Sequence, residues 1–209
     1  MGSCFFENEQ RTEKRECIMS IKEEVIFFIE NDFIKHTENV VNISMALADI
    51  FHIQNKKALM EAAVFHDFGK IIMIDRLAKR GPLSKTDRKI TSLHPNFSIS
   101  MTGDYISSDA AILILLHHAY IDGTGYPKIV RGKDLSLQIL QASDLYDALN
   151  SPRVYRKRRV NHWQEIILKK VGNKDILESL SGLNFKKLPH FYTMSQIVKD
   201  KVEHYFGFV

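Results

Sequence analysis

The stretch LILLHHAYIDGTGYP, residues 113–127, joins an apolar run, two adjacent histidines and a glycine-rich loop. The apolar run has helical character and places His117 and His118 at its C-terminal end. Neighbouring residues on a helix point about a quarter turn apart, so both imidazoles can face one site only if that site lies at the helix end. With Asp122 close behind, they form the donor set of a catalytic metal centre, although two surface histidines before an ordinary turn would give the same pattern.

Size and composition indicate a single globular domain. The 209 residues are enough for one substantial hydrophobic core, and 44% apolar with 26% charged residues is typical of globular proteins. No apolar stretch approaches the ~18 residues that span a bilayer, and the charged opening FENEQRTEKRE lacks the apolar segment of a secretory signal. We therefore expect a cytoplasmic protein without a membrane partner.

Cysteine usage and net charge narrow the chemistry further. Cys4 and Cys17 both lie in the opening segment, form no disulfide framework and have no metal-ligand spacing, which favours a reducing compartment. The net charge of +4 suits a phosphate-bearing ligand without indicating nucleic acid.

Helical patterns begin after a polar leader. Ser20 and Glu23 form a capping box that opens the first helical pattern, and a second pattern starts near His36. Asp32 lies one turn before His36, so the two side chains can share a helix face. We predict a polar leader at 1–19 and one helical domain at 20–209, with its motifs at about 30–160 and C-terminal helices at 161–209.

The next helical pattern, from about Lys56, ends in the sequence HDFGK. It places His66 and Asp67 side by side, with Gly69 at the expected end of the helix and Lys70 directly behind it. A neighbouring imidazole and carboxylate can be a satisfied core pair. Alternatively, the two oxygens of Asp67 can bridge two metal ions, and Lys70 can bind a phosphate.

Two later segments supply further donors. His94 directly precedes Pro95, which we expect to bend or end the local helix. In the helical pattern at 135–150, Asp144 and Asp147 lie one turn apart. Asp144 is the better candidate to point inward, because apolar side chains follow it.

A basic run follows at residues 153–159. Such a run is most often solvated surface, but Arg153 and Arg156 lie three residues apart and can bind one phosphate together if the segment is helical. Contact with nucleic acid is the alternative. Because the run is short and one-sided, we expect no nucleic-acid partner.

Together these motifs resemble those of the HD-GYP family, a branch of the metal-dependent phosphohydrolases with an HD domain. The resemblance covers residues 30–160, and it is specific because several motifs follow one another at compatible intervals. The matching segments are HTENV with His36, HDFGK at 66–70, the pair His94 and Pro95, HHAYIDGTGYP at 117–127, DLYDAL at 144–149 and RVYR at 153–156.

The resemblance implies an all-α fold, the helical bundle of the HD domain, with a short N-terminal helical extension and C-terminal helices. It implies two metal ions bridged by Asp67, with iron as the usual metal and manganese as the alternative, and five imidazoles with two carboxylates suit either. Some members hold a third ion through a Glu one turn before the first histidine, where this chain has Asp32. The implied ligands are His36, His66, Asp67 and Asp144 for one ion and His94, His117 and His118 for the second.

The activity implied is hydrolysis of a 3′–5′ phosphodiester in cyclic di-GMP, or in a mixed GMP–AMP ring. The expected products are the linear dinucleotide pGpG, GMP, or both. Two close cations would activate a water held between them and stabilise charge on the phosphoryl oxygens. The implied catalytic residues are Asp67 and Lys70, and the implied substrate-binding residues are Lys70, Asp122, Gly125, Tyr126, Arg153 and Arg156.

The chain departs from the family pattern at two positions. Ala119 stands where the run after the paired histidines commonly has Glu, and Ser98 stands where Gly is usual. These departures motivate an alternative function, a module that binds metal, cyclic dinucleotide or a diguanylate cyclase partner with little turnover. The family uses the GYP loop, here residues 119–127, to meet such a partner.

Overall fold

The computed structural model describes residues 28–78, 82–129, 134–151, 160–185 and 188. Within these ranges the chain is helical, and its one β-type pairing is an isolated bridge between Ala119 and Gly125. The expected all-α fold is therefore confirmed. The polar leader, the capping box at Ser20 and the basic run with Arg153 and Arg156 lie outside the described residues.

The described elements include a π-helix, η1, and two 3-10 helices, η2 and η3. None of the helices in the described ranges is both long enough and apolar enough to span a lipid bilayer. In chain order the elements are η1 (Ile29–Ile34), α2 (Lys35–Ile50), α3 (Lys56–Phe65), η2 (Phe68–Met73), α4 (Ile74–Leu77), α5 (Lys85–Thr91), α6 (His94–Thr102), η3 (Gly103–Tyr105), α7 (Ser108–Leu116), α8 (Leu135–Asn150), α9 (Trp163–Val171) and α10 (Lys174–Gly182).

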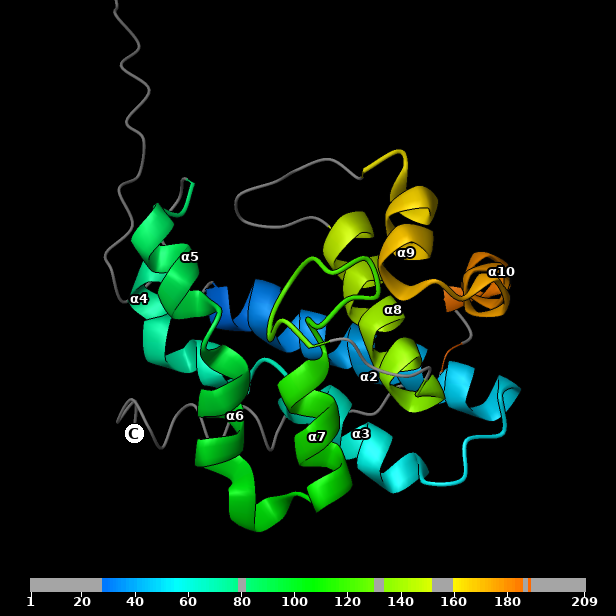
Figure 1. Cartoon of the computed structure of the whole chain (residues 1–209), viewed down its shortest axis with the longest axis horizontal. Coiled ribbons are helices and arrows are strands. Elements are labelled where there is room, and N and C mark those ends of the chain that lie inside the picture. Colours follow the sequence, from blue (N-terminus) through cyan, green and yellow to red (C-terminus); the bar gives the residue numbers. More distant parts are fainter. Residues whose placement is uncertain (1–27, 79–81, 130–133, 152–159, 186–187, 189–209) are drawn as a thin grey trace, which may run out of the picture.

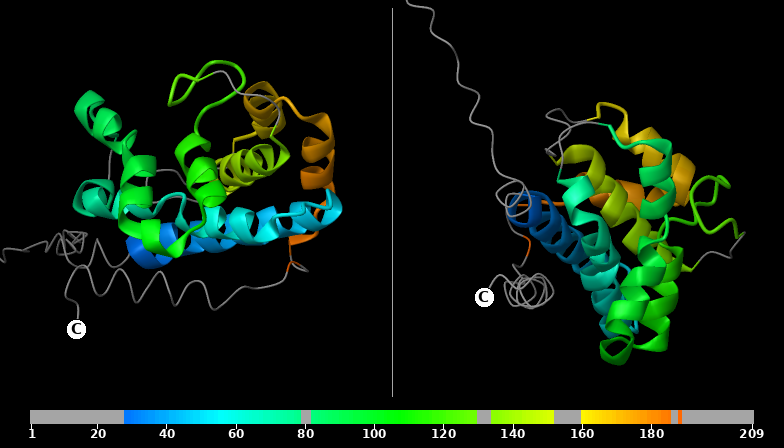
Figure 2. Two further views of the ribbon diagram at one scale, coloured as in Figure 1. Left: turned by 60° about the horizontal axis from the view of Figure 1, so that its bottom comes forward. Right: turned by 90° about the vertical axis from the view of Figure 1, so that its left-hand side faces the viewer.

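The two longest described helices, α2 and α8, pack against each other at the centre of the fold (Figure 1). α3 packs against α2, and α7 packs against α3. In Figure 1, α4, α5 and α6 lie on one side of this centre, and α9 and α10 lie on the other. Val40, Val41 and Leu47 of α2 and Ile139 and Leu140 of α8 are fully buried. The GYP loop projects from this helical body in both views of Figure 2.

Local sequence sets where several of the helices begin. At each of these starts, a side-chain oxygen of the residue before the helix accepts a hydrogen bond from a backbone N–H of the first turn. Ser84 and Asp87 form a complete capping box at α5. Gly172, with a φ of 70°, ends α9 in the left-handed conformation. The other caps of this kind are Asn55 at α3, Ser107 at α7, Asp134 at α8 and Asn173 at α10.

The helix that leads to the HD pair ends earlier than the sequence predicts. α3 stops at Phe65 and η2 begins at Phe68, so Gly69 lies inside η2 rather than at a helix end. A Cβ on Gly69 would overlap the carbonyl oxygen of His94 and lie 2.6 Å from the backbone nitrogen of Ser98. The glycine is therefore required because η2 and α6 touch backbone to backbone, and this contact sets the HD pair against the start of α6.

Pro95 begins a helix where the sequence predicts a bend or an end. α6 starts at His94, so Pro95 occupies its first turn. A proline is well tolerated there, because its missing N–H would have no partner within the helix. α5 has already ended at Thr91, and the short turn between the two helices holds His94 at the inner end of α6.

We expect Gly69→Ala to destabilise the domain, because the added methyl group cannot fit without moving η2 away from α6. The free energy of unfolding, measured by urea denaturation, should fall by about 1–3 kcal/mol. Gly103→Ala is the matched control, since a Cβ there meets nothing within 4 Å. Its effect should stay within about 0.5 kcal/mol. Equal stabilities for the two variants would contradict the backbone contact at Gly69.

Candidate metal centre

Imidazoles and carboxylates from five separate parts of the described chain meet in its interior. They come from the start of α2, the turn between α3 and η2, the start of α6, the residues just after α7, and α8. All are buried except one histidine, which is partly buried. The residues are His36, His66, Asp67, His94, His117, His118 and Asp144, which are all of the ligands that the resemblance implies for two ions.

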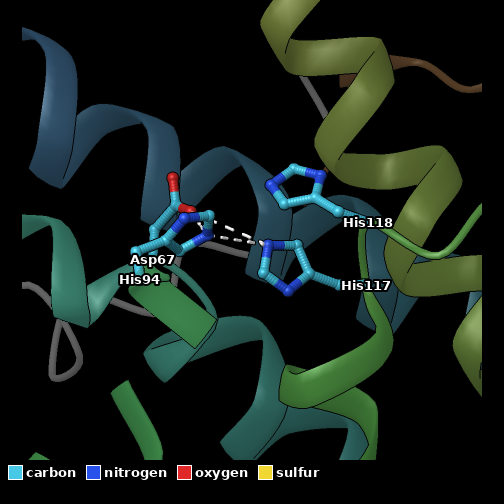
Figure 3. A group of neighbouring side chains, drawn as sticks. All are labelled: Asp67, His94, His117 and His118. Carbon is cyan, nitrogen blue, oxygen red and sulfur yellow. Dashed lines mark hydrogen bonds and ion pairs between the residues drawn. The ribbon is translucent and has the colours of Figure 1, made fainter. Parts of the chain in front are cut away.

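Asp67 lies between two groups of histidines. Its Oδ2 is 3.5 Å from His36 Nε2 and 3.6 Å from His66 Nε2. Its Oδ1 is 3.1 Å from His94 Nε2 and 3.8 Å from His117 Nε2. Each carboxylate oxygen thus faces its own pair of imidazoles, and Figure 3 shows the group on the Oδ1 side.

The remaining two residues complete the two groups. Asp144 Oδ1 is 3.2 Å from His36 Nε2, which places Asp144 with the first group. The His118 ring lies 4.0 Å from the His117 ring and 5.2 Å from the His94 ring between centroids, which places His118 with the second group. In Figure 3 both histidines of the pair point toward His94.

Three of the histidines hold their rings through a backbone carbonyl. In each case Nδ1 bonds the carbonyl oxygen three residues earlier, in the last turn of the preceding helix. A carbonyl oxygen only accepts hydrogen bonds, so the ring proton resides on Nδ1 and the lone pair of Nε2 points into the cluster. The pairs are His66 with Ala63 at 2.9 Å, His94 with Thr91 at 2.7 Å and His117 with Ile114 at 2.6 Å.

His36 is held by a carboxylate, Asp147, that the sequence analysis ranked below Asp144. Its Nδ1 lies 2.6 Å from Asp147 Oδ2, and Asn39 donates to Asp147 Oδ1 at 2.7 Å. Asp147 is buried as fully as Asp144, so both acids of α8 point inward. The three-residue spacing of the acids on one helix was the signal, because such residues share a face.

The geometry fits metal ions better than hydrogen bonds. His36 Nε2 lies 3.4 Å from His66 Nε2, and His94 Nε2 lies 3.2 Å from His117 Nε2, although each nitrogen presents a lone pair. Asp67 Oδ1 is buried and accepts no hydrogen bond from the described residues. Donors that share an ion at about 2.1 Å lie roughly 3.0–3.5 Å apart. The observed separations therefore match shared cations.

Burial favours the neutral form of three of the imidazoles. It lowers the pKa of His66 and of His117, and it lowers the pKa of His118 to about 3. Charge repulsion from His118 and His94 lowers the pKa of His117 further. A neutral imidazole has the free lone pair that binding to a metal ion requires.

The carboxylates, in contrast, keep their charge. Burial raises the pKa of Asp67, but the ammonium of Lys70, 2.5 Å from Oδ2, together with the surrounding imidazoles more than offsets this and holds the pKa well below its usual value. Burial also raises the pKa of Asp144, and the imidazoles of His36, His118 and His66 beside it together more than offset this effect. The cluster therefore combines negative carboxylates with imidazoles of which three are kept neutral by burial, and these are the protonation states that bind cations.

A cavity of about 680 Å³ opens onto the cluster. That volume is in the range of small-molecule and cofactor sites. Lys70 lines the cavity beside Asp67. The remaining walls are largely apolar and include Phe28, Phe33, Leu77, Leu83 and Leu145.

Two further charged residues line the cavity. Asp32, at the position of the third-site acid, is buried in η1 and lines the wall near His36. Arg88 lines the cavity from α5, where its Nε donates to the carbonyl of Leu83 at 3.1 Å. The sequence analysis missed Arg88, because it belongs to no motif and α5 has no buried face.

The GYP loop lies against the paired histidines. Gly123 and Gly125 have φ values of 74° and 81°, in the left-handed region that favours glycine. A Cβ on Gly125 would overlap the carbonyl oxygen of His118, so this glycine allows contact with the histidine segment itself. Tyr126 donates its N–H to the same carbonyl at 2.9 Å, and its ring lies 4.9 Å from the His118 ring.

Asp122 belongs to the turn of this loop. Its Oδ1 accepts hydrogen bonds from the N–H of Thr124 at 2.9 Å and from the Thr124 hydroxyl at 2.5 Å. The hydrogen bonds from Thr124 lower the pKa of the Asp122 carboxyl. Asp122 is not among the described residues that line the cavity, so the structure does not bring this predicted substrate contact to the cluster.

The two departures from the family pattern have structural roles. Ser98 Oγ accepts the N–H of Gly69 at 2.7 Å and donates to the carbonyl of His66 at 3.1 Å, which ties α6 to the HD turn. Ala119 is buried, and its carbonyl accepts from Gln141 of α8 at 3.0 Å. Neither position contributes a donor to the cluster, so neither departure removes one.

Fold and site together define the class of protein, an all-helical domain with a buried cluster of histidines and aspartates. A family model described as the HD domain matches residues 21–173. The chain belongs to the HD domain family. The cluster agrees with the divalent metal binding that an HD domain implies.

Several curated relatives match the same region. The chain is 33% identical over 102 residues, 46% of its length, to the cyclic di-GMP phosphodiesterase response regulator RpfG of Xanthomonas campestris pv. campestris, covering 27% of that protein. It is 34% identical over 104 residues, 47% of its length, to 3′3′-cGAMP-specific phosphodiesterase 3 of Vibrio cholerae, covering 22% of that protein. A cyclic di-GMP phosphodiesterase of Thermotoga maritima is 30% identical over 134 residues, with 58% of this chain and 35% of that protein covered. The chain thus spans about a quarter to a third of the length of these relatives.

These relatives support the HD-GYP branch of the family, which the motifs predicted. Among solved structures, the HD domain of the phosphodiesterase PgpH from L. monocytogenes matches 88% of this chain and 97% of that chain. The match has a TM-score of 0.49 and a sequence identity of 16%.

We expect Asp147→Asn to weaken metal binding, because the variant loses the negative charge that holds His36 with its proton on Nδ1. The affinity for Mn²⁺, measured by competition with a chelator, should fall about 10–100-fold. Asp75→Asn, on the exposed surface of α4, is the control and should keep the affinity of the unmodified chain. Unchanged affinity in Asp147→Asn would show that His36 does not need this carboxylate.

Proposed function

We propose that the chain is a metal-dependent phosphodiesterase that hydrolyses a 3′–5′ bond of a cyclic dinucleotide, cyclic di-GMP in the first instance. The observation that carries this proposal is the position of Asp67, whose two oxygens face two groups of imidazoles beside a cavity of about 680 Å³. The names of the relatives, phosphodiesterases of cyclic di-GMP and of 3′3′-cGAMP, support the substrate class. The products would be linear pGpG, GMP, or both.

The proposed ligand set divides at Asp67. His36, His66 and Asp144 would hold one ion with Oδ2, while His94, His117 and His118 would hold the second with Oδ1. Five imidazoles and two carboxylates suit iron, with manganese as the alternative. The bound ions would supply an activated water and offset the charge of the phosphoryl oxygens. Asp32 is the residue proposed for a third ion.

The protein side chains would bind and orient the substrate. Lys70 projects from η2 beside Asp67 and is placed to hold a non-bridging phosphate oxygen as charge develops there. Arg88 lines the same cavity and would bind the second phosphate of the ring. Phe28 and Phe33 offer apolar wall against which a base can pack. We keep Tyr126, Gly125, Asp122, Arg153 and Arg156 as proposed substrate contacts from the resemblance.

The GYP loop is the proposed contact for a diguanylate cyclase domain. Two large apolar side chains in and next to the loop are exposed, Ile121 by 57% and Ile129 by 48%. Exposed apolar side chains of this kind favour a protein partner. A cyclase forms the substrate that this cavity would consume, so the pairing would place both activities together in the cytoplasm.

The proposal is tested by anaerobic purification, metal analysis and chromatography of the products formed from cyclic di-GMP and from 3′3′-cGAMP. We expect at least two iron or manganese ions per chain and a linear product. Asp67→Ala should lose both metal and activity, because it removes the donor common to the two groups. His162→Ala, an exposed histidine before α9, should retain both. A metal-loaded chain that binds cyclic di-GMP over hours without a linear product would favour the binding-module alternative.

Arg88→Ala separates substrate binding from metal binding. We expect the variant to keep its metal content while kcat/KM for the cyclic dinucleotide falls about 10-fold or more, because one charge-assisted phosphate contact is lost. Lys89→Ala is the matched control, since Lys89 neighbours Arg88 on α5 but does not line the cavity. If the two variants have equal kcat/KM, Arg88 is not a substrate contact.

A further inference from the structure

His118 differs from the other histidines of the cluster in what holds its ring. A backbone carbonyl or a carboxylate faces Nδ1 in the other four, as described above. His118 Nδ1 instead lies 3.0 Å from the hydroxyl of Tyr120. Asp144 Oδ2 lies 3.9 Å from this nitrogen, beyond hydrogen-bond distance.

This difference affects which ring nitrogen of His118 carries the proton, because a hydroxyl can either donate or accept a hydrogen bond. A carbonyl forces the imidazole proton onto Nδ1, whereas a tyrosine hydroxyl that donates would shift the proton to Nε2. An imidazole protonated on Nε2 cannot bind an ion through that atom. The position of one hydroxyl hydrogen therefore decides whether His118 can complete the second group.

The hydroxyl belongs to a side chain that is itself held from two directions. Tyr120 is only 9% exposed, and the Nζ of Lys170 lies 4.1 Å from the centre of its ring. The same ammonium donates to the hydroxyl of Thr124 in the GYP loop at 2.8 Å. The Lys170 carbonyl also accepts the N–H of Ile121 at 2.9 Å, so Lys170 of α9 contacts the tyrosine ring and the residue that follows it in the chain.

We propose that Tyr120 is the positioning residue of His118. Its hydroxyl oxygen accepts the Nδ1–H of His118 and keeps the Nε2 lone pair directed at the group formed with His94 and His117. Lys170 of α9 fixes the tyrosine in that position. The inference rests on the metal centre of the proposed function, and it assigns a role in that centre to Tyr120 and Lys170, which lie outside the predicted ligand set.

Tyr120→Phe is the direct test, because it keeps the ring and its contact with Lys170 but removes the hydroxyl. Titration of the metal-free full chain with Mn²⁺, followed by the electron paramagnetic resonance of the free ion, should show two bound ions in the unmodified chain. In Tyr120→Phe one ion should bind as before, and the affinity for the other should fall at least about 10-fold. Tyr105→Phe, 65% exposed on η3, is the control and should bind both ions unchanged.

A second measurement reads the ring directly. Long-range ¹H–¹⁵N correlation spectra of the metal-free chain should show His118 protonated on Nδ1, and Tyr120→Phe should shift the proton toward Nε2. A role in folding alone would leave this tautomer unchanged. Lys170→Met should lower the affinity for the same ion. Lys169→Met, on the exposed face of α9, should leave that affinity unchanged.

The outcomes distinguish this inference from the proposed function. Two unchanged Mn²⁺ affinities together with an unchanged His118 tautomer in Tyr120→Phe would overturn the role of Tyr120 and leave the phosphodiesterase proposal standing. In the other outcome, the unmodified chain binds two ions but hydrolyses no cyclic dinucleotide, and Tyr120→Phe binds one of the ions more weakly. That result would overturn the proposed activity and support the positioning role.

Discussion

Burying the charge of Asp67 among five imidazoles is the constraint that orders this domain. The carboxylate is 3% exposed, and Lys70 together with the surrounding imidazoles holds its pKa well below the usual value against the effect of burial. A buried charge is unfavourable unless it is paired, and one ammonium reaches only one of the two oxygens. The other oxygen faces nitrogen lone pairs, an arrangement that is stable when cations lie between them. The helices around it are therefore arranged to present Nε2 atoms toward one centre.

Helix ends make this arrangement possible. The last carbonyls of an α-helix have no partner within the helix and carry its partial negative charge. His66, His94 and His117 each follow a helix end and donate Nδ1–H to one of those carbonyls. One hydrogen bond thus satisfies the helix end, selects the ring tautomer and aims the opposite nitrogen inward. The same contact recurs at the ends of α3, α5 and α7, which explains why these three histidines follow helix ends.

The cluster is supported differently where no helix end is available. His36 lies near the start of α2 and uses the carboxylate of Asp147, whereas His118 uses the hydroxyl of Tyr120. Ser98 joins the HD turn to α6 with two hydrogen bonds, at the position where the family pattern has glycine. These three contacts link the geometry of the centre to α8, to the GYP loop with α9, and to α6. A partner that contacted the GYP loop would therefore touch the segment that holds one of the proposed ligands.

Local sequence determined the helix caps, the glycines of the GYP loop and the identity of the donors, because these depend on residues three or four positions apart or on a single side chain. It did not determine the end of α3 or the start of α6, since both depend on the backbone contact of Gly69 with α6. Only the tertiary structure decided which donors meet. His36 and Asp147 lie 111 residues apart, and Arg88 reaches the cavity from a helix without a motif. Such pairings follow from the packing of α2 against α8 and from the position of α5 beside the cavity. A side chain's partner across that distance leaves no periodic signal in the sequence.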